Sequence, residues 1–213
     1  MREVNDLKKW NYAYTITGDF DYETVIEELK TIARGEHVNL VVKVLSTPII
    51  HQAAILDFEG NPVFMVGLMV FDALFSFYIE DYEHKTELYL LLMKILSSFD
   101  GLVFFSFSYH EKEEIQKVYQ YLEYQGVDLS AYRELDQIPI INLQLSKFES
   151  LLEALYSIHP KMKISGDSLF RNNRLVNQLF YARKYEEIVV HNQNCLVNES
   201  IIFKKRWLKL FTI

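Results

Sequence analysis

The chain is poor in cysteine, glycine and proline, and it has no long apolar run. The one cysteine among 213 residues excludes an internal disulfide and is typical of a reducing compartment, so the cytoplasm is the expected location. Seven glycines, four prolines and 50% apolar residues exclude a disordered chain. The apolar stretch from Val63 to Leu74 contains Asp72 and is too short to cross a bilayer, and the N-terminus lacks a signal-peptide pattern. We therefore expect no membrane segment.

Basic residues are also in deficit. The chain has 22 Lys and Arg against 29 Asp and Glu, a net charge of -7, which argues against a protein that coats nucleic acid nonspecifically. A local basic segment, Lys204 to Lys209, contains Trp207. This segment fits either a phosphate-backbone contact or the positive charge that suits a helix C-terminus.

The periodicity of apolar residues predicts an ordered α/β domain with little besides helices and strands. Strands are expected at 38–45, 49–58, 63–70, 74–79, 102–107 and 138–143, and helices at 21–33, 83–97, 111–125, 146–158, 167–180 and 186–208. This order predicts a central mixed sheet, three antiparallel strands plus parallel strands, flanked by helices and followed by a helical C-terminal part. We expect residues 1–48 to form an appendage of one helix and one strand, and residues 49–213 to form the main domain.

Two acids close the second predicted strand. In Asp57-Phe58-Glu59 the carboxylates are two residues apart, so they point to the same face of the strand and can share a divalent cation. The alternative is a strand end that runs into the turn at Gly60, where acids are common and solvated. The spacing alone does not decide between the two.

A second acidic segment, from Phe105 to Ile115, leaves a strand and opens a helix with the sequence FSFSYHEKEEI. Two later segments follow in order: Lys147 to Gly166, which ends in an I-S-G turn, and HNQNCL from His191 to Leu196. In the order and spacing of these pieces the chain resembles the RNase H-like DEDD exonuclease superfamily, and more narrowly its YprB and RecB-associated branch, from about Ile50 to Leu208.

The resemblance implies two-metal phosphodiester hydrolysis with Mg²⁺ or Mn²⁺. It implies that Asp57 and Glu59 are metal ligands, that Glu111 is the acid of the second motif, and that His191 orients or deprotonates the attacking water. These four residues are the expected catalytic set.

The same resemblance suggests residues that touch the substrate. Tyr109 and His110 stand beside Glu111 and are expected to line the cleft, and Asn194 stands next to the last motif position. The expected partner is nucleic acid, DNA or RNA and single-stranded, or else a protein; the aromatic content also suits self-association.

The last acid of the family pattern is replaced by Cys195. A thiol is a poor ligand for a hard cation, so one metal site is expected to be impaired. Three alternatives stay open: Glu199, one helical turn on, reaches inward; His191 and Cys195 bind a softer metal such as zinc; or Cys195 is a small buried apolar residue.

Three functions are therefore compatible with the sequence. The first is a metal-dependent 3′–5′ exonuclease with an incomplete acidic site. The second is a catalytically inactive exonuclease-like domain that serves as a nucleic-acid-binding or protein-interaction subunit. The third is an α/β interaction protein whose resemblance to nucleases is accidental.

Overall fold

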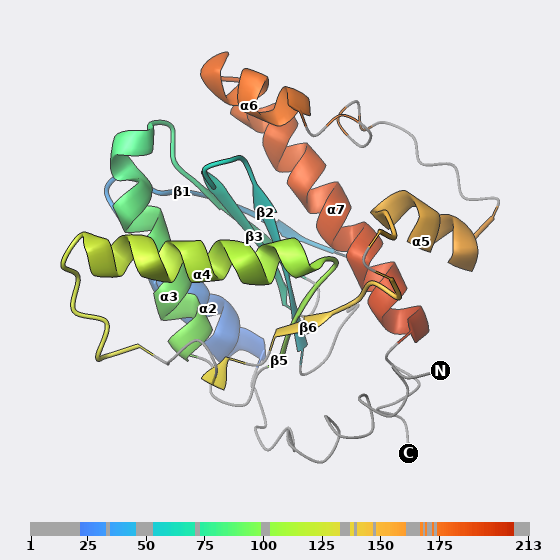
Figure 1. Ribbon diagram of the computed structural model, residues 1–213, viewed down its shortest axis with the longest axis horizontal. Coiled ribbons are helices and arrows are strands. Elements are labelled where there is room, and N and C mark those ends of the chain that lie inside the picture. Colours follow the sequence, from blue (N-terminus) through green and yellow to red (C-terminus); the bar gives the residue numbers. More distant parts are fainter. Residues whose placement is uncertain are drawn as a thin grey trace.

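The computed structural model describes residues 22–32, 35–45, 53–70, 73–98, 103–132, 137–138, 140–146, 148–160, 167, 169, 172 and 174–206. The strands are β1 (Asn39–Val44), β2 (Ala53–Glu59), β3 (Met65–Val70), β4 (Ala73–Tyr78), β5 (Val103–Ser106) and β6 (Ile140–Asn142). The helices are α2 (Tyr22–Ile32), α3 (Lys85–Ser98), α4 (Tyr109–Tyr124), α5 (Leu151–Ile158), α6 (Arg174–Tyr181) and α7 (Tyr185–Arg206), with a 3-10 turn at Tyr82–His84. Figure 1 shows the strands running between the helices.

The strands form one mixed sheet in the order β1-β4-β3-β2-β5-β6. β2, β3 and β4 are a continuous antiparallel meander, whereas β5 pairs parallel to β2 and β6 parallel to β5. The mixed α/β class, the three antiparallel strands, the added parallel strands and the helical C-terminal part are thus confirmed. β2 lies inside the sheet, between β3 and β5.

Helices cover both faces of the sheet, which explains why β2 to β5 read as near-continuous apolar runs. Alternate residues of β2 enter different cores: Ala54 and Leu56 pack in the larger apolar cluster, which α2, α3 and α4 share. Ala53 and Ile55 pack in a smaller cluster with α5 and α7. Every second residue of β2 therefore faces α7.

The last helix, α7, is unusual in what it buries. Its inner surface carries polar side chains that are shielded from solvent, together with apolar ones. Toward its end, Phe203 packs edge-on against Phe105 of β5, with ring centroids 4.5 Å apart, and Arg206 forms an ion pair with Glu149 at 2.6 Å. The end of α7 is thus anchored by apolar packing and by a largely buried charge pair.

Two helices begin later than the periodicity predicts. α5 begins at Leu151 instead of 146, because Ser150 caps it: the Ser150 hydroxyl accepts from the Glu153 backbone N–H and the Glu153 carboxylate accepts from the Ser150 backbone. α6 begins at Arg174 instead of 167, because the Asp167 carboxylate accepts from the Leu169 backbone N–H at 3.0 Å, a local turn that competes with helix.

The segment expected as an appendage contributes to the sheet. β1 pairs antiparallel with β4 along its whole length, and the boundary expected between residues 48 and 49 lies outside the described residues. None of the helices in the described part of the chain is both long and apolar enough to cross a membrane.

Candidate functional site

The end of β2 presents two carboxylates to α7. Asp57 and Glu59 occupy the face of β2 that Ala53 and Ile55 share, and they are 9% and 6% exposed. The Asn192 side-chain amide donates to Asp57 Oδ2 at 2.9 Å, and Glu59 Oε1 lies 3.7 Å from His191 Nε2. The prediction that both acids share one strand face is confirmed, and the alternative of a solvated strand end is wrong because both are buried.

A third acid reaches this region from the start of α4. Glu111 is the third residue of that helix, and its Oε2 accepts from the Ser108 backbone N–H and the Ser108 hydroxyl, at 3.2 and 2.7 Å. This capping box fixes the carboxylate over the end of β5. Its negative charge helps to raise the pKa of Asp57, after burial, which is the larger cause.

Asp167 supplies a fourth buried acid that the sequence did not suggest. Its Oδ2 lies 2.8 Å from His191 Nδ1, and its side chain is buried. Because an ionised carboxylate only accepts hydrogen bonds, His191 Nδ1–H donates to Asp167, and Nε2 is the ring nitrogen that faces Glu59. The available signal was its position in the sequence, directly after the I-S-G segment that the family resemblance uses.

Glu199 is a fifth acid and does reach inward. It is 2% exposed, and its Oε2 has no hydrogen-bond partner. Burial raises its pKa well above the usual range, and the charges of Asp57, Glu111 and Glu59 raise it further. Glu199 therefore points at the same group of acids, as one of the three sequence alternatives proposed.

Asn192 orients Asp57 from the centre of α7. The strand register places Asp57, Gly67 and Ser76 side by side on β2, β3 and β4, and Asn192 lies across them, accepting from the Ser76 hydroxyl at 3.1 Å. A Cβ on Gly67 would lie 2.3 Å from Asn192 Oδ1. The absence of a side chain at Gly67 is what allows this close approach, which sequence reasoning missed.

Cys195 completes the inner surface of α7 one turn after His191. Its Sγ lies 3.9 Å from His191 Nε2, and Glu59, His191 and Cys195 offer ligand atoms that all lie within 4.8 Å of one another. Burial, followed by the charges of Asp57 and Glu59, raises the pKa of the thiol well above its usual range. Asp57 and Glu111 are outside this tight group but act on it electrostatically.

Three expected substrate contacts lie away from the acids. Asn194 is half-buried and stands about 200° around α7 from Asn192, so it faces away from Asp57. Tyr109 is 59% exposed, and exposed His110 pairs with Glu114 at 3.7 Å. The structure therefore does not bring these three side chains together with the acids.

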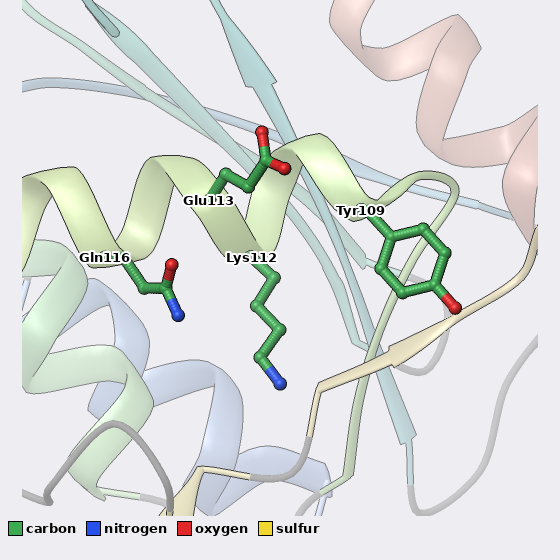
Figure 2. A pocket seen from close by; sticks show the side chains of 4 residues that line it. All are labelled: Tyr109, Lys112, Glu113 and Gln116. Carbon is green, nitrogen blue, oxygen red and sulfur yellow. The ribbon is translucent and has the colours of Figure 1, made fainter. Parts of the chain in front are cut away.

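Tyr109 instead borders a shallow hollow of about 330 Å³ along α4, whose other lining residues are Lys112, Glu113 and Gln116. Figure 2 shows Lys112 and Gln116 extending from one side of the helix and the Tyr109 ring at its first turn. The hollow offers one aromatic surface and one cation.

The buried acids outnumber the buried cations at this site. Burial, with the charge of Asp57 next, raises the pKa of Glu59 well above its usual range, and burial raises the pKa of Glu111. Burying several carboxylates together is unfavourable unless they are protonated or bind a cation. The unpartnered Glu199 oxygen and the oxygen-rich ligand set fit a divalent cation.

Comparison of the chain with protein-family models, with curated proteins and with solved structures finds no match.

Proposed function

We propose that this chain is an RNase H-like domain of the DEDD exonuclease type that hydrolyses phosphodiester bonds of nucleic acid with divalent cations, Mg²⁺ or Mn²⁺. The observation that carries the proposal is the convergence of five buried acids at the end of the inner strand β2: Asp57, Glu59, Glu111, Asp167 and Glu199. The order β4-β3-β2-β5-β6, with an antiparallel meander followed by parallel strands, supports the fold assignment.

Four of these acids would hold the cations. Asp57 and Glu59 contribute from β2, Glu111 from the first turn of α4, and Glu199 from α7. The ions supply Lewis-acid chemistry, which activates water and stabilises the leaving oxygen. Glu199 thus takes the part that the sequence pattern assigns to the position of Cys195.

His191 acts as the proton acceptor in this proposal. Asp167 holds the imidazole by its Nδ1–H, so the free Nε2 takes a proton from the attacking water. Burial of both side chains keeps the imidazole in this orientation. Asp167 therefore positions the imidazole, and His191 accepts the proton.

The substrate approaches α4 in this proposal. Tyr109 offers an exposed ring on which a base can stack, and Lys112 offers a positive charge for a phosphate. Stacking on a single exposed ring requires an unpaired base, which favours a single strand over a duplex.

The test is cleavage of end-labelled single-stranded DNA and RNA with Mg²⁺ or Mn²⁺. Asp57→Asn should lower the rate by about 10²–10³-fold, the range seen when one electrostatic group is removed from an active site. The matched control is Glu114→Gln. Glu114 is a buried acid like Asp57, but it lies on α4 and pairs with Lys117. Chelation of the metal should abolish cleavage in the wild-type protein.

The second candidate is an inactive domain that binds nucleic acid or protein, and Cys195 favours it, since a thiol stands where the pattern has an acid. Binding of the labelled strands without cleavage under either metal would support this candidate and overturn hydrolysis. Cleavage that Asp57→Asn leaves unchanged would overturn the proposed site.

A further inference from the structure

The tightest group of ligand atoms at the site is not made of carboxylates alone. Cys195 Sγ and His191 Nε2 are 3.9 Å apart, and His191 Nε2 and Glu59 Oε1 are 3.7 Å apart. Ligands around a tetrahedral zinc ion lie about 3.4–3.6 Å from one another, given metal–ligand bonds of about 2.0–2.3 Å. These two distances exceed the spacing of zinc ligands by only a few tenths of an ångström, and the ligand atoms of Cys195 and Glu59 lie within 4.8 Å of each other.

The imidazole is already oriented for metal binding. Asp167 Oδ2 lies 2.8 Å from His191 Nδ1, which leaves Nε2 as the ring nitrogen that faces Cys195 and Glu59. A carboxylate behind a metal-ligating histidine is the usual outer-shell arrangement at zinc sites. The helix contributes as well, because residues four apart present their side chains on the same face.

A further buried carboxylate acts on this group electrostatically. Glu199 is 2% exposed and its Oε2 lacks a partner, and its charge acts on both Cys195 and Glu59. The Glu199 oxygen is buried without a hydrogen-bond partner. This observation is independent of the cysteine, and it also points to a bound cation.

We propose that Glu59, His191 and Cys195 bind one Zn²⁺ ion, with Glu199 as the fourth ligand. A thiolate and an imidazole favour zinc over magnesium, since softer ligands select softer metals. The inference about binding stands whether or not the chain cleaves nucleic acid. One consequence rests on the proposed function: zinc on His191 Nε2 occupies the lone pair that accepts the proton, so Zn²⁺ inhibits hydrolysis supported by Mg²⁺ or Mn²⁺.

The test uses Co²⁺ as a spectroscopic probe and Zn²⁺ as competitor. A second group, His37, His84 and Glu87, also brings three ligand atoms together at the surface, so the measurements are made with His84→Ala as the background. The full chain should take up one Co²⁺ with a thiolate-to-cobalt charge-transfer band, and one Zn²⁺ should displace it.

Two variants separate binding at Cys195 from binding elsewhere. Cys195→Ser should abolish the charge-transfer band and lower the affinity for Zn²⁺ by more than about 100-fold. This loss is larger than the one caused by mutating residues that only hydrogen-bond to metal ligands. Cys195→Asp should lose the band and gain affinity for Mn²⁺. Circular dichroism confirms folding of each variant, and Glu114→Gln should bind Co²⁺ and Zn²⁺ as the background does.

The outcomes are distinct. No thiolate band in the background protein, or Zn²⁺ binding that Cys195→Ser leaves intact, overturns the zinc site even if Mn²⁺ supports cleavage. A thiolate band in a protein that never cleaves nucleic acid upholds the zinc site and overturns the proposed hydrolysis. Cleavage that Zn²⁺ inhibits in the background but not in Cys195→Asp upholds both.

Discussion

The two faces of β2 differ sharply in what they bury. Toward α3 and α4 the strand presents Ala54 and Leu56 to an apolar core. Toward α7 it presents Ile55 and then Asp57 and Glu59, both buried. One face follows the rule that buried residues are apolar, and the other departs from it only at the end of the strand. A departure confined to one end of one face is typical of a functional site.

The largest expected effect contrasts adjacent residues on the two faces. Leu56→Ala should lower the free energy of unfolding by about 2–5 kcal/mol, since it opens a cavity in a fully buried core. Asp57→Asn should leave the metal-free stability unchanged or raise it at neutral pH, because it removes a buried charge and keeps an acceptor for Asn192. Urea unfolding of both variants checks this. Equal destabilisation would show that the faces do not differ in kind.

The next effect concerns the contact between Gly67 and Asn192. Gly67→Ala should cost about 1–3 kcal/mol, because the added methyl group overlaps the amide. Adding Asn192→Ala should recover part of this loss, giving a coupling of about 0.5–3 kcal/mol in a double-mutant cycle. Strict additivity of the two losses would contradict the close approach of the amide to β3.

The pH dependence of stability should also separate the two faces. Burial raises the pKa of Asp57 above its ordinary value of 3.8, and that of Glu59 above 4.5. The folded state therefore keeps protons on these two acids at pH values where the unfolded state has lost them. Their contribution to the stability of the folded state is full below about pH 4, and it declines as the pH rises toward the raised pKa values of the folded state. Thermal melts of metal-free protein should show a smaller decline in Asp57→Asn. Identical slopes would contradict the raised pKa.

The smallest effect is expected at the surface of α4. Tyr109→Ala should change stability by less than about 0.5 kcal/mol, because the ring is mostly exposed. It should weaken binding of a single strand by about tenfold, near the lower end for base stacking on an aromatic ring. Tyr124→Ala, at the other end of the helix and 87% exposed, is the control for fluorescence-anisotropy titrations and should bind normally.

Local sequence patterns predicted the elements and the acids that lie on them. Alternation along a strand placed Asp57 and Glu59 on one face, whereas Glu111 was singled out by the resemblance of its segment to a family motif. Asp167 was missed because its partner is His191, and only tertiary packing brings a connecting segment to α7. Asn192 was missed because its role depends on the missing side chain of Gly67 on β3, a residue far from Asn192 in the sequence.

The starts of α5 and α6 also differ from the predicted ones. Periodicity detects apolar faces and does not show which polar side chain caps a helix. Ser150 lies inside the predicted run 146–158 and caps α5 there, and Asp167, the first residue of the run 167–180, bonds to the Leu169 backbone before α6 begins. Exact boundaries therefore depended on single hydrogen bonds.

The bond from Asn192 to Asp57 joins residues 135 positions apart. Contacts of such separation form slowly, because a long loop must close before they contribute. Asp57 and Glu59 are synthesised long before the helix that buries them, and we expect them to stay hydrated until α7 docks. In folding terms we expect the acidic centre to form late, so that its assembly would report that the C-terminal helix has reached the sheet in the correct register.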